Sequence, residues 1–192
     1  DRQLATVYRD TALDAGGSYS ASASVTIPAG ITGNWHLIVA TDYYSYQPEA
    51  DEANNTDAYA LSLSAPNLTL QVTAPPQSIS NGQTLTVNWS VTNTGSSAAD
   101  AAWSERAVLS KDEYFGNYDD IVVGSFYQNE PLASGEAISR SAGVTVPWGL
   151  LGSYRLYVQV DRWNQVPESD KADNSYQAAI EIQYATPPAD LQ

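Results

Sequence analysis

One segment of this chain recurs 119 residues further on, without a gap. Residues 1–65 align with residues 120–184, and 21 of the 65 aligned positions are identical. The identities include turn residues, as where Pro28 matches Pro147. A fixed period with shared turn residues predicts consecutive copies of one structural unit.

The repeat divides the chain of 192 residues into three parts. Residues 66–184 are predicted to form one complete unit, and residues 1–65 the C-terminal part of a preceding one. Residues 185–192, with two adjacent prolines, are predicted to be a semi-rigid linker to a next unit. We expect the counterpart of residues 66–119 ahead of the first residue, in a longer chain. That segment, or a second chain, would cover the core faces of the partial unit.

Two-residue alternation of apolar and polar side chains dominates the pattern and indicates strands. From Leu85 to Val91, for example, every second residue is apolar. Seven strands rich in Val, Thr and Tyr predict an all-β fold, an immunoglobulin- or fibronectin-III-like β-sandwich with Trp89 or Trp103 between its sheets. The last four strands should recur in residues 1–65. The strands expected in the complete unit are 68–72, 83–93, 103–109, 121–127, 137–146, 153–160 and 176–182.

Charge and composition exclude several classes of function. The chain has 22 Asp and Glu against 8 Lys and Arg, a net charge of −14. Such a chain repels phosphate backbones, which argues against a nucleic-acid partner. No apolar run approaches the roughly 18–20 residues of a membrane span, so we expect no membrane insertion. Cysteine is absent, which excludes disulfides, thiolate metal sites and a cysteine nucleophile.

Fifteen of the 22 acids lie in three windows that we interpret as loops, 42–57, 100–120 and 161–173. Oxygen donors at this density suit calcium, which takes about six to eight oxygen ligands. An alternative is that the carboxylates accept backbone N–H bonds within turns. Lys171 replaces Glu52 in the aligned loop, which puts a cation at a ligand position. The predicted ligands are Asp112, Asn117, Asp119 and Asp120 in one loop, Asp42, Glu49 and Asp51 in another, and Asp161, Glu168 and Asp170 in the third.

Catalytic chemistry has little support. The single histidine, His36, lies within an expected strand and matches Arg155, which favours a solvent-facing position over a catalytic triad. Paired carboxylates of the kind that a glycosidase needs occur in both copies of the repeat, which favours an architectural role. We therefore predict that the chain is not an enzyme.

Aromatic side chains gather at one expected loop tip. Tyr43, Tyr44 and Tyr46 are close neighbours in sequence, and Trp163 matches Tyr44 in the second copy. Exposed aromatics beside polar residues can stack on sugar rings or anchor a protein interface. The alternative is that they fold back over the end of the sandwich and cover its core.

Three motifs are specific: VTNTG at 91–95, LSKD at 109–112, and the Asp…Glu…Asn-Asn pattern of the repeated acidic loop. With them, nearly the whole chain resembles the cell-adhesion-related domain found in bacteria (CARDB). The resemblance implies immunoglobulin-type sandwiches, in tandem within large secreted or surface proteins of bacteria, with no catalytic residues. One departure is that residues 171–174 replace the usual Glu-x-Asn-Asn ending, which residues 52–55 retain.

These observations predict a non-enzymatic extracellular structural or adhesion module, a calcium-stabilised spacer repeat of a bacterial secreted or surface protein. The expected partners are neighbouring repeats of the same polypeptide, a second chain that completes the partial unit, and a surface glycan or protein. Two alternatives remain open: a carbohydrate- or protein-binding module that uses the loop-tip aromatics, and an accessory domain of a secreted hydrolase.

Overall fold

The computed structural model describes residues 1–185, which form ten β-strands. Within these residues no helix is long and apolar enough to cross a membrane. The expected linker lies outside the described residues except for Ala185. The strands are β1 (Gly33–Ala40), β2 (Thr56–Leu63), β3 (Leu68–Val72), β4 (Ser78–Ser80), β5 (Thr84–Asn93), β6 (Trp103–Ser110), β7 (Ile121–Gln128), β8 (Ala137–Thr145), β9 (Gly152–Gln159) and β10 (Ser175–Gln183).

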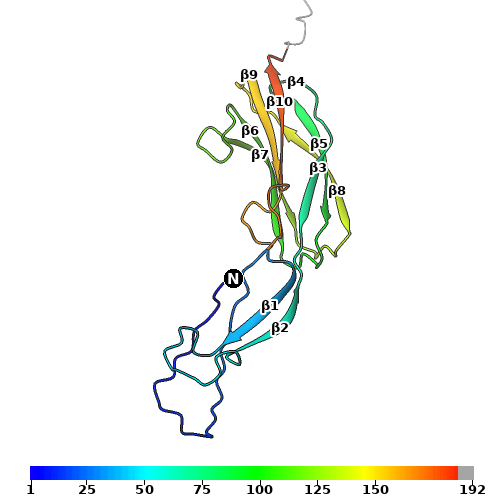
Figure 1. Ribbon diagram of the computed structural model, residues 1–192. Coiled ribbons are helices and arrows are strands. Elements are labelled where there is room, and N and C mark those ends of the chain that lie inside the picture. Colours follow the sequence, from blue (N-terminus) through cyan, green and yellow to red (C-terminus); the bar gives the residue numbers. More distant parts are fainter. Residues whose placement is uncertain (186–192) are drawn as a thin grey trace, which may run out of the picture.

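Strands β3 to β10 form a β-sandwich, which we call the sandwich (Figure 1). One sheet has the order β4-β10-β9-β6-β7, and the other has the order β3-β5-β8. The alternation in sequence predicted seven of these strands to within one residue at each end. The predicted all-β sandwich is therefore confirmed.

The eighth strand, β4, was not predicted. It pairs in parallel with β10, and Ile79 lies opposite Ile182. β3, just before it, pairs with β5 in the other sheet, so the chain changes sheets between Val72 and Ser78. A three-residue strand with a single apolar residue shows no alternation, and it depends on its partner for pairing.

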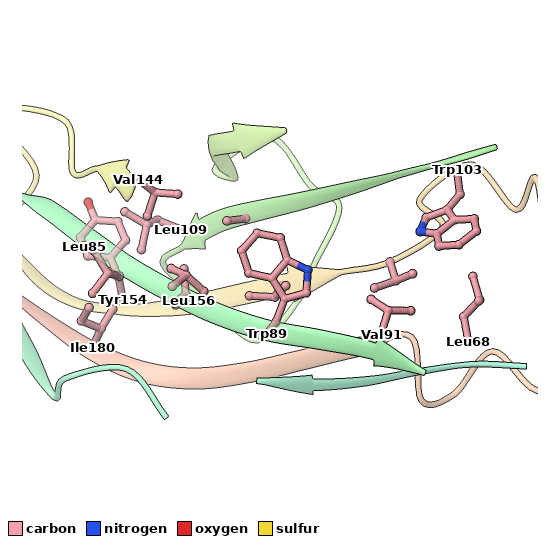
Figure 2. Packing of buried hydrophobic residues seen from close by; sticks show 14 of the residues in the cluster. Leu68, Leu85, Trp89, Val91, Trp103, Leu109, Val144, Tyr154, Leu156 and Ile180 are labelled. Atoms are coloured by element: carbon pink, nitrogen blue, oxygen red, sulfur yellow. The ribbon is translucent and has the colours of Figure 1, made fainter. Parts of the chain in front are cut away.

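The core lies between the two sheets and contains both candidate tryptophans (Figure 2). Trp89 from β5 is 3% exposed and Trp103 from β6 is 1% exposed. The prediction named one or the other, whereas both are buried. Because alternate side chains of a strand face one side of its sheet, β5 buries Leu85, Val87, Trp89 and Val91 together.

A carboxylate links the two sheets inside this core. Glu105 is 1% exposed and accepts hydrogen bonds from the indole nitrogens of Trp89 (2.6 Å) and Trp103 (3.1 Å). Arg140 from β8 pairs with the same carboxylate at 3.1 Å. Burial of a charge is costly unless it is paired and hydrogen-bonded, and these three donors meet that condition. Our interpretation of residues 100–120 as a loop was wrong for Glu105, because β6 contains it.

The first 65 residues, which we call the N-terminal segment, contain only two strands. β1 and β2 form an antiparallel hairpin in which Trp35 lies opposite Leu61. The aligned residues of the sandwich, Tyr154 and Ile180, lie opposite each other in β9 and β10. The hairpin therefore has the register of the last two strands of the sandwich.

Four strands were expected in the N-terminal segment, but residues 1–32 contain none. Their aligned residues form β7 and β8 by pairing with β6 and β5, and the segment has no counterpart of those two strands. Without those two strands, apolar residues whose counterparts lie in the core of the sandwich are exposed. Val39 is 52% exposed, whereas the aligned Val158 is 1% exposed.

Candidate functional site

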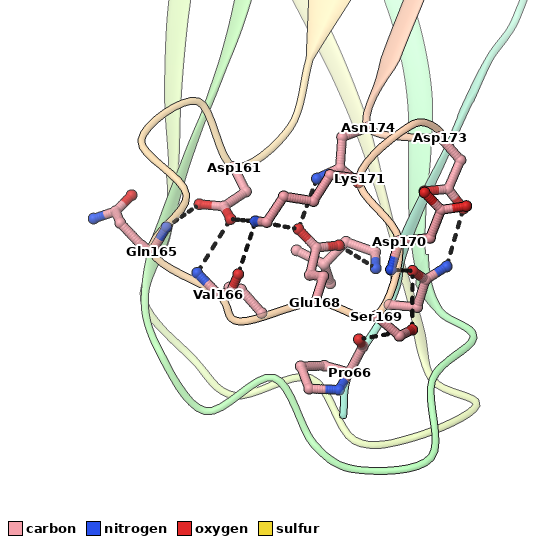
Figure 3. Close-up of polar contacts among 12 residues, drawn as sticks. Pro66, Asp161, Gln165, Val166, Glu168, Ser169, Asp170, Lys171, Asp173 and Asn174 are labelled. Atoms are coloured by element: carbon pink, nitrogen blue, oxygen red, sulfur yellow. Dashed lines mark hydrogen bonds and ion pairs between the residues drawn. The ribbon is translucent and has the colours of Figure 1, made fainter. Parts of the chain in front are cut away.

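The loop between β9 and β10, residues 160–174, buries three polar side chains (Figure 3). Asp161, Glu168 and Asn174 are 2%, 5% and 5% exposed. Asp161 and Asn164 have positive φ angles of 46° and 53°, a conformation that Asp and Asn adopt more readily than most residues. We call this segment the acidic loop.

Asp161 closes the first turn of the acidic loop. Its two oxygens accept hydrogen bonds from the backbone nitrogens of Gln165 (2.7 Å) and Val166 (3.1 Å). Val166 is fully buried, so the turn fixes an apolar residue in the core.

Glu168 connects the acidic loop to the start of the sandwich. Its Oε2 accepts a 2.6 Å hydrogen bond from the backbone nitrogen of Leu68, and its Oε1 accepts a 2.6 Å bond from Asn174 Nδ2. Burial raises the pKa of Glu168 above its usual range, and the bonds from Asn174, Leu68 and Lys171 act in the opposite direction.

Lys171 supplies the positive charge in this cluster. Its Nζ lies 3.0 Å from Asp161 Oδ2 and 3.2 Å from Glu168 Oε1, and it also donates to the carbonyl of Val166 at 2.8 Å. The ammonium therefore offsets the repulsion between two buried carboxylates.

Further hydrogen bonds join the acidic loop to the first residues of the sandwich. Ser169 N donates to Pro66 O at 2.9 Å, and Asp170 N donates to Asn67 Oδ1 at 2.9 Å. Asn67 Nδ2 donates to Asp173 Oδ2 at 3.0 Å. With the bonds from Leu68 N to Glu168 and from Leu70 N to Asp173 O (3.1 Å), we call these contacts between residues 66–70 and 168–173 the latch.

The latch lies where the N-terminal segment meets the sandwich. Only four residues, 64–67, separate β2 from β3, and Ala65 accepts a 2.9 Å bond from Ser96 N. Two glycines allow backbone segments to approach each other closely at this join. A Cβ on Gly30 would lie 2.5 Å from Glu168 O, and a Cβ on Gly95 would lie 2.4 Å from Ala65 O. Beside these contacts lies a cleft of about 490 Å³, whose lining includes residues 27–31 and Ser97, Ala98, Asp100 and Ala101.

The aligned loop of the N-terminal segment repeats the same turn. Asp42 has φ 39°, and its oxygens accept from the nitrogens of Tyr46 (2.9 Å) and Gln47 (2.8 Å). Asp51 accepts from Ala53 N at 2.9 Å, as Asp170 does from Ala172 N at 2.9 Å. Backbone capping thus occupies oxygens that we predicted as calcium ligands.

Beyond the turn, the two loops differ. Glu52, the counterpart of Lys171, accepts bonds from Glu49 N (3.0 Å) and Asn55 Nδ2 (3.2 Å). Glu49, the counterpart of Glu168, is exposed. Glu168 binds the start of β3 through Leu68, and the N-terminal segment has no strand that corresponds to β3.

In the loop between β6 and β7, the predicted ligands also bind the backbone. Asp112 accepts from Tyr114 N (2.8 Å) and Asn117 Nδ2 (3.1 Å). Asp119 accepts from Lys111 N at 3.2 Å, and Asp120 Oδ2 accepts from Gly116 N at 2.5 Å. Asp120 Oδ1 is buried and has no hydrogen-bond partner.

The carboxylates predicted as calcium ligands are not arranged as a metal site in this structure. Residues 1–185 contain no group of three or more His, Asp or Glu side chains placed to hold a metal ion. In the acidic loop, the ammonium of Lys171 takes the place that a cation would need. Calcium binding stays a prediction.

The loop-tip aromatics are exposed and do not cover the core. Tyr43, Tyr44 and Tyr46 are 78%, 69% and 83% exposed, and Trp163 is 64% exposed. Tyr44 contacts both neighbours, with ring centroids 5.2 Å from Tyr43 and 5.6 Å from Tyr46. The guanidinium of Arg162 lies 4.2 Å from the centroid of the Trp163 ring.

Sequence reasoning did not find the contacts of Asn67, Asp173 and Glu105. Asn67 and Asp173 are 106 residues apart, and no local pattern joins them. The available signal for Glu105 was its place in an expected strand, on the same face as the apolar residues Trp103 and Ala107.

Comparison with known proteins places the chain in a family. The CARDB family model matches residues 65–178. No curated protein was found to match. Among solved structures, the CARDB domain of a Pyrococcus furiosus protein, in complex with di-metal ions, is similar at 16% identity with a TM-score of 0.49, over 65% of this chain and 100% of that one.

Two further structures are similar at a comparable level. A domain of a candidate cell surface protein from Methanosarcina acetivorans has 20% identity and a TM-score of 0.44, over 62% of this chain and 93% of that one. A β-glucosidase from Listeria innocua has 16% identity and a TM-score of 0.43, over 67% of this chain and 17% of that one. Because the family model matches more than half of its residues, this chain belongs to the CARDB family.

Proposed function

We propose that the chain is a non-enzymatic extracellular module whose consecutive units act as a stiff spacer within a large bacterial secreted or surface protein. In this proposal the N-terminal segment and the sandwich are two copies of one unit. The shared hairpin register and the shared loop turn support it.

The observation that carries the proposal is the join between the two units. Pro66 and Ala65 are buried, and their carbonyl groups accept bonds from the acidic loop and from the loop after β5. A linker whose backbone is bonded to the following unit cannot swing as a free Gly/Ser chain does. The close approach of Gly30 to Glu168 O adds a second point of contact. Two points of contact restrict rotation as well as separation.

A pair of glycine variants tests the stiffness of the join. Gly30→Val places a side chain against Glu168 O, whereas Gly149→Val, at the aligned position of the sandwich, meets nothing within 4 Å. Both positions have positive φ (76° and 86°), so the local backbone strain is matched. By small-angle X-ray scattering, we expect Gly30→Val to broaden the distribution of overall dimensions and Gly149→Val to leave it unchanged. Equal profiles for both variants would contradict the proposal.

The exposed tyrosine cluster favours a second candidate function, recognition of a surface glycan or protein. Three rings at 69–83% exposure, of which Tyr44 contacts the other two, offer apolar ring surface together with hydroxyl groups. A glycan array probed with the wild type and with the Tyr43→Ala/Tyr44→Ala/Tyr46→Ala variant tests this candidate. Signals that persist in the variant, or no signal from the wild type, would contradict glycan recognition.

A further inference from the structure

The two ends of the sandwich are bonded to each other. At the start, residues 66–70 bond to residues 168–173 through the latch. At the end, β10 bonds to β4 and its neighbours: Glu181 N donates to Gln77 O at 2.8 Å, and Asn81 N donates to Gln183 O at 2.9 Å. Ala185 N then donates to Asn81 Oδ1 at 3.2 Å. The first sixteen residues of the sandwich thus bind its last eighteen directly.

We propose that these bonds make the sandwich resistant to mechanical force, and that tension along the polypeptide is carried by shear between segments 66–81 and 168–185. This inference rests on the proposed function, because only a unit within a covalent array experiences tension from both ends. It adds a mechanical activity and assigns it to two segments.

The direction of the strands supports shear. The chain enters the sandwich beside the N-terminal hairpin, and β10 points toward the opposite end (Figure 1). Tension therefore pulls the two segments in opposite directions along their length. β4 and β10 are parallel, with Ser78, Ile79 and Ser80 opposite Glu181, Ile182 and Gln183. Parallel strands pulled from opposite ends slide past each other, so their bonds are loaded together and not broken one at a time.

The latch lies at the point where load enters. Its bonds involve the first residues after the join, so they must break before tension reaches the rest of β3. Glu168 and Leu68 are buried, and breaking a buried hydrogen bond without access to water leaves both groups unsatisfied. The latch therefore resists initial separation more than exposed bonds of the same number would. In this proposal, residues 82–167, which include Glu105 and its partners, carry less of the load than these contacts.

Constant-force measurements on single molecules of the full chain test this inference. The chain has no cysteine, so handles attach only to cysteines added at its two ends. The test variants are Glu168→Gln and Asn67→Ala, and Asn67→Ala keeps the test valid if the first variant folds poorly. The control is Val144→Ala, which removes core volume from β8 outside both segments. Equilibrium stability of each variant is measured in denaturant alongside the force measurements.

We expect each latch variant to raise the unfolding rate of the sandwich under constant force by about tenfold, because forced unfolding depends on the unfolding barrier. Val144→Ala should raise it less for the same loss of equilibrium stability. If latch and control variants raise the rate equally at equal stability loss, the inference is overturned. A mobile join with a latch-dependent unfolding rate would defeat the spacer proposal alone, and a stiff join with a latch-independent rate would defeat this inference alone.

Discussion

The carboxylate of Glu168 accepts a 2.6 Å hydrogen bond from the backbone nitrogen of Leu68, a residue 100 positions earlier in the chain. The bond joins the first strand of the sandwich to the loop before its last strand. It also lies next to the join with the N-terminal segment, where Ser169 N binds Pro66 O. One buried side chain therefore connects the first strand of the sandwich to the loop that lies beside the join.

Glu168→Gln should lower the free energy of unfolding by about 1–3 kcal/mol, because the amide NH₂ group replaces one of two oxygens that accept buried bonds. Denaturant unfolding measures this loss, and the m-value should not change. The matched control is Glu49→Gln, at the aligned and exposed position of the N-terminal segment. Its effect should stay within about 0.5 kcal/mol. Equal effects of the two substitutions would contradict our assignment of Glu168.

Lys171→Met should destabilise the sandwich in a pH-dependent way. The substitution leaves Asp161 and Glu168 buried without their cation, at a cost of about 2 kcal/mol near neutral pH once the 36% exposure of the Lys171 side chain is allowed for. The native pKa of Glu168 is raised above its unfolded value, so the stabilising effect of its protonation is present at low pH. That effect is lost as pH rises through the native pKa.

Removal of the ammonium should raise this pKa further, so the deficit of Lys171→Met should be smaller at pH 5 than at pH 8. Free energies of unfolding at the two pH values check this. Lys111→Met, on a different loop, should show no such dependence. A deficit of Lys171→Met that is constant with pH would show that the ammonium does not act through the buried carboxylate.

Glu105→Ala should be among the most destabilising single substitutions, at about 3–5 kcal/mol. It leaves the indole N–H groups of Trp89 and Trp103 without acceptors and removes the carboxylate that pairs with the Arg140 guanidinium. Thermal and denaturant unfolding measure the loss, and Glu130→Ala on the exposed surface is the control. A loss below about 1 kcal/mol would mean that the cluster only balances its own desolvation cost.

Calcium distinguishes two accounts of the loop between β6 and β7. If Asp112, Asp119 and Asp120 bind calcium, millimolar calcium against excess EGTA should raise the melting temperature by several degrees, through about 2.7 kcal/mol at 100 times the dissociation constant. Asp112→Asn with Asp119→Asn should abolish that shift. In the other account, these carboxylates only accept hydrogen bonds from backbone nitrogens, and calcium should not change the melting temperature. A shift that survives both substitutions would place calcium elsewhere.

Much of the fold followed from local pattern. Alternation predicted the seven longer strands because each has one core-facing side or several buried apolar residues. It missed β4, whose pairing with β10 is a tertiary contact of Ile79. It overpredicted strands in residues 1–32, because strand pairing needs partners that the segment does not have. The local sequence favours extended structure, but a sheet forms only where neighbouring strands are available for pairing.

The candidate site was only partly predictable. The sequence analysis singled out the acids of the repeated loop, and hydrogen bonding of their carboxylates to the backbone was one of its two interpretations. The alignment of Lys171 with Glu52 indicated that the two loops differ in charge. Its simultaneous contact with Asp161 and Glu168 depends on how the loop folds. The contacts of Asn67 with the acidic loop could not be predicted, because no pattern in either segment refers to the other.

The distance between the N-terminal segment and the sandwich tests the central claim of a stiff join most directly. Spin labels on His36→Cys in β1 and Ser141→Cys in β8, both exposed and the only cysteines present, report that distance by double electron–electron resonance. We expect one narrow distance distribution in the wild-type background and a broader one with Gly30→Val. A wild-type distribution as broad as that of a flexible linker would contradict the account.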